Sequence, residues 1–402
     1  MPSIPFSPFI TLPLPELYCG AGTVKHLPEL AARFGRTVLL ITGKRALQQS
    51  GRLMALQAAM QQGGLKLFHE VIEREPSPEI VNRVVAEYRQ YGVEVVVAIG
   101  GGSVLDGGKA ISGMLCYHEP VERFIEGLPN MVPFDGRKVP FIAVPTTAGT
   151  GSEVTNNAVI SRVGDNGFKR SLRHRALVPN IAVVDPELMV GTPASLTIAS
   201  GMDACTQLLE AYTSPFATPY TDAVALSGLN HFSRSFVAAC GSGTNDVAVR
   251  GDVAYAACMS GVALANAGLG VVHGFASSVG GLIDIPHGVL CATLLYEATR
   301  ENIEALRQLE SNHPQLQKFS CAGSIMVRGV GMEVSSAPSI EEGCELLLAL
   351  LEHWQERFNF ARLQNYGLQL HHIPVLVQAT RTKSNAVALS STAMERILHN
   401  RL

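Results

Sequence analysis

VEVVVAIGGGSVLDGGK (residues 93–109) is the stretch that decides the fold of this chain. Its first seven residues are short, β-branched and almost wholly apolar, which predicts a strand buried on both faces of a parallel sheet. Three glycines then allow a tight turn and a close approach of the backbone to a ligand, because they carry no Cβ. We expect Ser103 to cap a helix that begins near Val104. Free N–H groups and the positive end of the helix dipole would then face an anion such as a phosphate.

The glycine turn matches neither of two common phosphate-binding motifs. A Rossmann fingerprint read from Gly100 needs a third glycine where Leu105 stands. A Walker A motif ending at Lys109 would need glycine in place of Ser103 and a hydroxyl residue in place of Ala110. The stretch is therefore a phosphate-cradling loop of another kind, or a structural turn in which Ser103 is only a cap.

Length and composition indicate an enzyme-like globular chain. The 402 residues predict two domains, which we place at 1–190 and 191–402. A hydrophobic content of 47% with 16% charged residues excludes disorder, and a net charge of −3 argues against nucleic acid or an anionic membrane as partner. Eight cysteines without a CxxC pair, no basic leader, and no apolar run near the roughly 20 residues of a membrane span predict a cytoplasmic protein.

Strands and helices alternate in the first half. Buried strands are expected at 37–42, 93–99, 141–144 and 181–186, with a weaker candidate at 65–69. Helices are expected over 46–62 and from the Ser77-Pro78-Glu79 start to about residue 91. This alternation predicts a doubly wound, Rossmann-like parallel sheet, in which ligands bind beyond the carboxyl ends of the strands, where Gly43 and the 100–103 turn lie.

A second polar loop, PTTAGTGSE (residues 145–153), follows the strand at 141–144. Thr146, Thr147 and Thr150 offer hydroxyl and N–H donors to a pyrophosphate or a nicotinamide amide. Lys169 and Arg170 follow a turn at 164–167 and could neutralise a phosphate. The alternative interpretations are that the 145–153 loop is only a polar connection and that Lys169 and Arg170 belong to a solvated basic surface.

The second half has long helical patterns and no clear strands. Asp203 and Gln207, four residues apart, share one helix face. His273 and His287 stand in a stretch with almost no charge. One Asp and two His form a plausible ligand set for Fe²⁺ or Zn²⁺ that leaves positions open for substrate. The alternative is that His273 and His287 are core residues whose hydrogen bonds are satisfied within the protein and that they bind no metal.

Five ordered motifs resemble those of the iron-containing (group III) alcohol dehydrogenase family. They are GGGSVLDGGKA (100–110), PTTAGTGSE (145–153), DPEL (185–188), GMDA (201–204) and the pair GLGVVHG (268–274) and IPHG (285–288). The resemblance implies a dehydroquinate synthase-like fold, with an α/β dinucleotide-binding domain followed by an all-helical domain. It also implies that metal and nicotinamide meet in the cleft between the domains, and that the chain forms a homodimer.

Carried over by position, the resemblance implies two sets of site residues. The cofactor-binding set is Gly43, Gly101, Gly102, Ser103, Asp106, Thr146, Thr147, Thr150 and Lys169. The metal-binding set is Asp203, Gln207, His273 and His287.

Three departures from the family pattern change these expectations. Gln207 replaces a common His, and its amide oxygen is a weaker, harder donor that lowers affinity and blurs the preference for Fe²⁺ or Zn²⁺. Ser277 stands where many members have a proton-relay His, so the catalytic residue is unknown. Gly43-Lys44-Arg45 stands where NAD-preferring members often have Asp, which favours NADP(H) over NAD(H).

The expected function is that of an NAD(P)-dependent alcohol dehydrogenase or aldehyde reductase acting on a small substrate. A divalent metal would act as Lewis acid on the substrate oxygen during hydride transfer. The first alternative is a metal-free NADPH-dependent reductase similar to maleylacetate reductases, with Arg170, Arg173 and Arg175 binding substrate carboxylates. A more distant alternative is a catalytically silent dinucleotide-binding protein.

Overall fold

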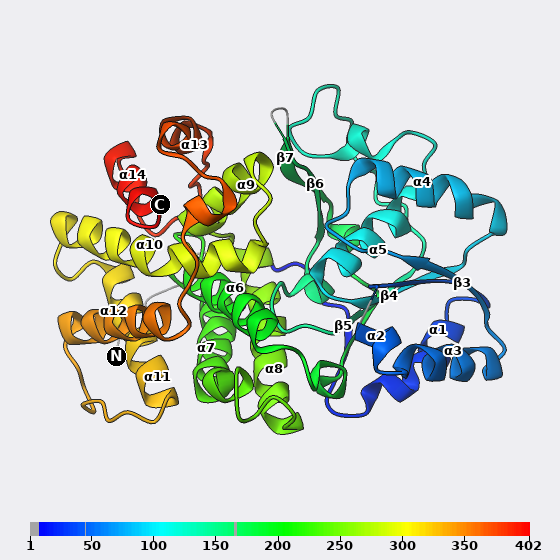
Figure 1. Cartoon of the computed structure of the whole chain (residues 1–402), viewed down its shortest axis with the longest axis horizontal. Helices are drawn as coiled ribbons and strands as arrows, with labels where there is room; N and C mark the ends of the chain where they lie inside the picture. The colour runs from blue at the N-terminus through cyan, green and yellow to red at the C-terminus, as the bar shows by residue number, and fades with distance from the viewer. Residues whose placement is uncertain (1–7, 45, 165–166) are drawn as a thin grey trace. The chain divides into compact units, whose positions relative to one another are not determined.

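The computed structural model of the chain describes residues 8–44, 46–164 and 167–402 (Figure 1). These residues form two compact units. The first runs from Pro13 to Val190, and the second comprises Gly191–Leu402 with the described residues before Pro13. Each unit has hydrophobic clusters of its own.

Six described strands of the Pro13–Val190 unit form one parallel sheet in the order β1-β8-β5-β4-β2-β3. The strands are β1 (Glu16–Cys19), β2 (Thr37–Thr42), β3 (Lys66–Val71), β4 (Val95–Gly100), β5 (Phe141–Pro145) and β8 (Ile181–Val184). Every residue of β4, at the centre, is buried, as its apolar sequence predicts. The predicted Rossmann-like sheet is confirmed.

Helices cover both faces of this sheet. On one side lie α1 (Leu27–Ala32), α2 (Ala46–Gln49) and α3 (Arg52–Gln62), and on the other α4 (Pro78–Tyr88) and α5 (Gly102–Met114) (Figure 1). Successive strand residues point to opposite faces, so Val97 packs with the first group and Val96 with the second. Short 3₁₀ turns lie at Thr23–His26, Arg89–Tyr91, Val121–Phe124, Ser152–Val154, Arg175–Leu177 and Pro186–Met189.

The direction of winding reverses between β2 and β4. The chain leaves β2 toward β3 at one edge, whereas it leaves β4 toward β5 on the other side. Ligands of doubly wound sheets bind at the carboxyl ends of the strands that flank such a switch point. Gly43 follows β2 and Gly101 follows β4, so the predicted glycine turns lie at this point.

Helix boundaries differ from the sequence-based expectation at two places. The helix expected over 46–62 is broken at Gly51, which adopts a positive φ of 71°. Helix α5 begins at Gly102 with Gly101 as N-cap, so Ser103 lies in the first turn and is not the cap. The predicted start of α4 is confirmed, because the Ser77 side chain accepts a hydrogen bond from the Ile80 N–H.

An antiparallel hairpin of β6 (Asn157–Arg162) and β7 (Phe168–Arg173) was not predicted as strands. Charged residues dominate the second strand, FKRSLR, and mask the signal of its two buried apolar residues, Phe168 and Leu172. Asp165 and Asn166 of the predicted turn lie outside the described residues.

All of Gly191–Leu402 is described, and every regular element in it is a helix, as predicted. The α-helices are α6 (Ala194–Thr213), α7 (Pro219–Ala239), α8 (Val247–Ala267), α9 (Val271–Leu282), α10 (His287–Leu309), α11 (Pro314–Gly329), α12 (Ile340–Arg357), α13 (Ile373–Ala379) and α14 (Ser391–His399). Two 3₁₀ turns, Leu363–Tyr366 and Leu370–His372, lie before α13.

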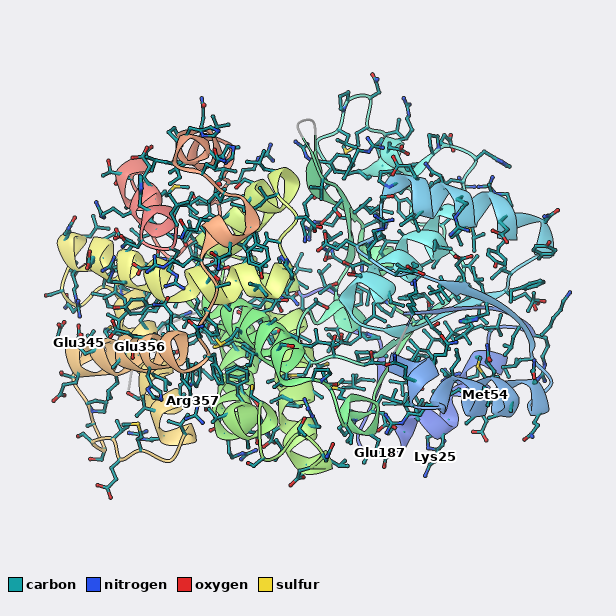
Figure 2. The ribbon with its side chains drawn as sticks, viewed as in Figure 1. Lys25, Met54, Glu187, Glu345, Glu356 and Arg357 are labelled. Atoms are coloured by element: carbon teal, nitrogen blue, oxygen red, sulfur yellow. The ribbon has the colours of Figure 1, made fainter. Side chains whose placement is uncertain are left out.

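Helix α12 illustrates how this unit separates core from surface. Leu347 and Trp354 are buried, and the Trp354 ring lies edge-on to two phenylalanine rings of α7. Glu345, Glu356 and Arg357 of the same helix are exposed (Figure 2). This distribution is typical of an amphipathic helix that covers a core.

Among the described helices, α8 is long and apolar enough to cross a membrane by length and composition alone, although no such segment was expected. It carries Arg250, whose buried guanidinium donates to the Thr192 carbonyl and the Thr197 hydroxyl. It also carries Asp252, which accepts from Ser235 on α7. These contacts are those of a core helix.

Candidate metal centre and cofactor loops

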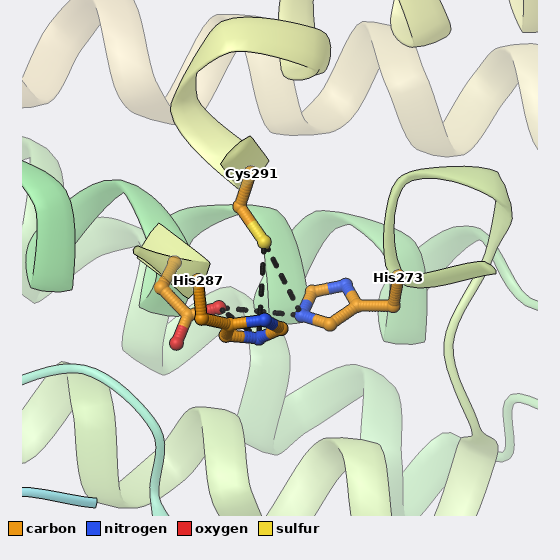
Figure 3. Close-up of side chains that lie close together, drawn as sticks. His273, His287 and Cys291 are labelled. Carbon is orange, nitrogen blue, oxygen red and sulfur yellow. Dashed lines mark hydrogen bonds and ion pairs between the residues drawn. The ribbon is translucent and has the colours of Figure 1, made fainter. Parts of the chain in front are cut away.

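Four potential donor atoms from three helices converge in the helical unit. Asp203 lies on α6, His273 on α9, and both His287 and Cys291 on α10. Their ligand atoms all lie within 4.8 Å of one another (Figure 3). Asp203 Oδ1 is 3.3 Å from His273 Nε2 and 3.4 Å from His287 Nε2. Cys291 Sγ is 3.9 Å from each of the same two nitrogen atoms.

The start of α10 brings two of these donors to α6. His287 is the first residue of α10 and Cys291 follows four residues later, so both lie on the same helix face. A Cβ on Gly288 would lie 2.2 Å from the carbonyl oxygen of Ala199 in α6. Only glycine lets the two backbones approach this closely.

Glu210 orients His273 from the other end of α6. One carboxylate oxygen accepts the Val272 N–H at 2.7 Å, and the other lies 2.7 Å from His273 Nδ1. A carboxylate can only accept, so Nδ1 carries a proton, and Nε2 is the ring nitrogen that faces Asp203 and can bind a metal once it has lost its own proton. Asn385 completes the start of α9 by accepting the Val271 N–H at 3.0 Å.

The charges of this cluster stabilise one another. Burial alone would raise the pKa of Asp203, but the His287 and His273 imidazoles hold it below its ordinary value. Burial would likewise raise the pKa of the Cys291 thiol, and the same imidazoles lower it. Burial would lower the pKa of His273, yet Cys291 and Asp203 hold it well above its ordinary value. Buried anionic groups in such contact suit a cation.

The donor set fits a divalent first-row metal ion. Carboxylate oxygen, imidazole nitrogen and thiolate sulfur are the three donor types found in protein zinc sites, and imidazole also suits iron. Asp203, His273 and His287, predicted from the sequence as ligands, are brought together by the structure. Their role as ligands stays a prediction.

Gln207 has a different partner. Its amide oxygen accepts a hydrogen bond of 2.6 Å from the Ser260 hydroxyl, which lies on α8. The assignment of Gln207 as a ligand stays a prediction, but its one potential donor atom is engaged by this hydroxyl. Ser277, which stands at the place of the family's relay His, is exposed and donates to the His273 carbonyl at 3.2 Å.

The two loops predicted to bind cofactor lie against each other in the Pro13–Val190 unit. A Cβ on Gly101 would lie 3.3 Å from Thr147 Oγ1, and one on Gly102 would lie 2.5 Å from Thr150 Cγ2. The Thr146 N–H donates to the Gly100 carbonyl at 2.9 Å. The threonine loop therefore packs directly on the N-terminus of α5, the part of a helix that attracts phosphate.

A buried lysine anchors this threonine loop. The ammonium of Lys109, which is fully buried, donates to the carbonyl oxygens of Ser152 (2.7 Å), Thr155 (3.1 Å) and Asn157 (2.8 Å). The hydroxyls of Ser152 and Thr155 lie at 3.2 and 2.9 Å. Burial lowers the pKa of Lys109 to about 8. Lys109 thus holds the loop in place from inside the unit.

Both charged residues predicted to bind the cofactor, Asp106 and Lys169, have partners within the protein. Asp106 accepts from the Ser152 hydroxyl and, at 3.0 Å, from the Val159 N–H, so it also holds this loop. Lys169 forms an ion pair with Glu75.

Lys44, the residue on which the NADP(H) preference rests, is half-exposed and pairs with Glu73 at 2.8 Å. Arg45 lies outside the described residues. Two of the arginines considered for a metal-free reductase are engaged: Arg170 donates to the Gly127 carbonyl, and Arg173 to the Glu126 carboxylate at 3.1 Å.

Three residues of these sites were missed by sequence reasoning. Cys291 follows His287 by four residues and Glu210 follows Asp203 by seven, which are spacings of a shared helix face. Lys109 stands inside the glycine motif itself. The helical spacing of these residues is therefore visible in the sequence. The sequence does not show which of the many residues with such a spacing come into contact in the fold.

Comparison with known proteins matches nearly the whole chain to one family. The model "Iron-containing alcohol dehydrogenase" matches residues 15–186, and "Fe-containing alcohol dehydrogenase family, C-terminal" matches residues 197–402. A solved structure of 1,3-propanediol oxidoreductase is similar with a TM-score of 0.86 and 27% identity, covering 98% of this chain and 100% of that one.

Curated relatives agree with this match. The probable alcohol dehydrogenase EutG of Escherichia coli (strain K12) is 35% identical over 282 residues, 70% of each chain. The 1,3-propanediol dehydrogenase of Klebsiella pneumoniae is 37% identical over 276 residues, 67% of this chain and 69% of the relative. The NADPH-dependent butanol dehydrogenase of Clostridium saccharobutylicum is 31% identical over 321 residues, 78% of each chain. The resemblance in the sequence motifs is thus confirmed, and the chain belongs to the iron-containing alcohol dehydrogenase family of oxidoreductases that act on CH–OH groups.

Proposed function

We propose that this chain interconverts a small alcohol and its aldehyde by hydride transfer to and from a nicotinamide cofactor, with a divalent ion held by Asp203, His273 and His287. The observation that carries the proposal is the convergence of these three donor atoms, with both imidazole Nε2 atoms within 3.4 Å of one carboxylate oxygen. A silent dinucleotide-binding protein would have no use for this arrangement. The relatives named for propanediol and butanol support a small alcohol as substrate.

The protein's part in this reaction is to bind, orient and hold protons at defined atoms. Glu210 keeps the proton of His273 on Nδ1, which leaves Nε2 free to bind a metal. When bound, the metal ion supplies Lewis-acid polarisation of the substrate oxygen. The packed glycine and threonine loops offer N–H and hydroxyl donors to the cofactor pyrophosphate.

The proposed cofactor is NADP(H) in preference to NAD(H). Lys44 follows the first strand of the switch point, where a cation favours a 2′-phosphate and a carboxylate would repel it. We expect Lys44→Ala to weaken NADPH binding more than NADH binding, measured by fluorescence titration. Equal weakening of both would contradict the preference.

The function is tested by metal analysis and assay together. The protein is purified without chelator, its Fe and Zn contents are measured, and NADPH-dependent aldehyde reduction is followed before and after chelation. We expect near-stoichiometric metal, loss of activity on chelation, and recovery when the ion is restored. Activity in metal-free protein would favour the metal-free reductase, and tight NADPH binding without any activity would favour the silent binder.

We also propose that the chain acts in the cytoplasm as a homodimer, without nucleic acid or membrane partners. All eight cysteines, each within the described residues, are free thiols, which supports a reducing compartment. Sedimentation analysis should give about twice the chain mass of 42.9 kDa. A species of single-chain mass would contradict the dimer.

A further inference from the structure

We propose that Cys291 binds the metal ion as a thiolate, that Gln207 does not bind it, and that this exchange makes the site select Zn²⁺ over Fe²⁺. The inference rests on the proposed metal site and identifies its fourth protein ligand and its metal. Neither the family match nor the names of the relatives assigns a role to Cys291.

The two O···N and two S···N distances of the cluster agree with a four-coordinate zinc site. Zn–N and Zn–O bonds of about 2.0–2.1 Å in a tetrahedron imply O···N edges of about 3.3–3.4 Å, and a Zn–S bond of about 2.3 Å implies S···N edges of about 3.6 Å. The O···N distances from Asp203 are 3.3 and 3.4 Å. The S···N distances from Cys291 are 3.9 Å to both imidazoles. The sulfur therefore lies equidistant from the two nitrogens and within about 0.3 Å of the tetrahedral spacing.

Helix geometry fixes Cys291 in this place. His287 and Cys291 are one turn apart at the start of α10, and the thiol is fully buried. Its Sγ points at the two Nε2 atoms, not away from them (Figure 3). A buried thiol whose polar neighbours are two ligand nitrogens and a carboxylate is placed to bind a cation.

Gln207 is placed to do something else. Its oxygen accepts from Ser260 at 2.6 Å, and this hydroxyl belongs to α8, which contributes no donor to the cluster. The Ser260 hydroxyl also lies 2.7 Å from the Ala257 carbonyl oxygen, so the contact with Gln207 is part of a hydrogen-bonded link between α6 and α8. Structural packing between α6 and α8 therefore accounts for Gln207.

The exchange of an amide for a thiolate changes which metal the site prefers. A thiolate is a soft donor that selects Zn²⁺, whereas an amide oxygen suits hard ions. Asp203, His273, His287 and Cys291 would hold the ion, which would supply Lewis-acid polarisation of a substrate oxygen. As the sulfur–metal bond forms, the thiol proton leaves to solvent.

Cobalt provides the spectroscopic test. Metal-free protein is titrated with Co²⁺, and thiolate-to-cobalt charge transfer is followed in the near ultraviolet. We expect one equivalent to bind with a charge-transfer band in the unmodified chain and in Cys344→Ser, and no band in Cys291→Ser or Cys291→Ala. Cys344 is a matched control because it is also a buried helical thiol, in α12. Circular dichroism of the metal-free variants checks that each is folded.

Selectivity is measured by anaerobic competition between Zn²⁺ and Fe²⁺ against a chelator. Removal of the thiolate in Cys291→Ser should lower the preference for Zn²⁺ at least tenfold. Gln207→Ala should keep the charge-transfer band and have a Zn²⁺ dissociation constant within about threefold of that of the unmodified chain. Loss of a direct metal ligand would raise this constant by more than the 10–100-fold that follows from loss of a residue hydrogen-bonded to a ligand.

The outcomes separate the two proposals. One equivalent of Co²⁺ bound without a charge-transfer band, or with a band that persists in Cys291→Ala, overturns the role of Cys291 and leaves the metal site standing. A Zn²⁺ preference unchanged in Cys291→Ser overturns the selectivity. A Gln207→Ala variant that loses Zn²⁺ affinity as strongly as Cys291→Ser shows that the amide is a ligand after all. Failure of the unmodified chain to bind any Co²⁺ overturns the metal site itself.

Discussion

Replacing Glu210 by Gln tests how much the position of one proton, on Nδ1 of His273, contributes to metal binding. The Glu210 carboxylate accepts from the Val272 N–H and from His273 Nδ1, each at 2.7 Å. Gln has the same shape but only one accepting oxygen. If that oxygen stays on the Val272 N–H, the amide NH₂ faces Nδ1, and the imidazole proton has to move to Nε2, the atom that faces Asp203. If the amide turns over, its NH₂ faces the Val272 N–H and two donors meet.

Either arrangement weakens metal binding. Partners of this kind typically contribute 10–100-fold to metal affinity, which is about 1.4–2.7 kcal/mol. We expect the Zn²⁺ dissociation constant of Glu210→Gln to rise within this range, measured by competition with a chromophoric chelator. Thermal unfolding of the metal-free variant measures the structural part of the effect separately.

Glu297→Gln is the matched control. Glu297 is a buried carboxylate of α10 whose partners are Arg300 and Asn400, and neither is a donor of the cluster. Its substitution should leave the Zn²⁺ dissociation constant unchanged. A Glu210→Gln variant with wild-type metal affinity, or an equal effect of the two substitutions, would refute the reasoning about the His273 proton.

Three further predictions concern the Pro13–Val190 unit. Lys109→Met should lower the free energy of unfolding by about 3–5 kcal/mol, because it leaves buried carbonyls without their donor, whereas Lys66→Met on the surface should not; urea denaturation followed by circular dichroism decides between them. Burial raises the pKa of Glu153 from 4.5 to about 7, so the folded state holds a proton that the unfolded state has already lost. Relative to Glu153→Gln, the unmodified chain should lose about 3 kcal/mol of stability as the pH rises from 4.5 to 7, and parallel pH profiles of the two would exclude this. Gly102→Ala should weaken NADPH binding at least tenfold by pushing Thr150 away, with partial recovery in Gly102→Ala/Thr150→Ala; unchanged affinity in the single variant would show that the loop tolerates the shift.

The sheet and the glycine turns were predictable because their signals are local. The residues of β4 are apolar one after another, and the glycines follow it directly in the sequence. The threonine loop could be identified by its composition, but its contact with Gly101 and Gly102 depends on β4 and β5 being neighbours in the sheet.

The parts that could not be predicted depend on contacts between distant segments. Nothing near Gln207 in the sequence shows that its oxygen meets Ser260, 53 residues away. Cys291 is one of eight cysteines, and only the packing of α10 on α6 distinguishes it. Lys109 is unexpected because lysine is among the residues least often buried, and its partners lie 43 to 48 residues further along.

The contact at Gly288 limits how this centre can vary. The atom in the way of a larger side chain is a main-chain oxygen of α6, so no substitution of another side chain can make room for it. A residue other than glycine would move the first turn of α10 as a body, and His287 and Cys291 would shift together. The positions of His287 and Cys291 therefore depend together on one quantity, the distance between the backbones of α6 and α10. Engineering the site for a larger ion means respacing α6 and α10 and not exchanging donors one at a time.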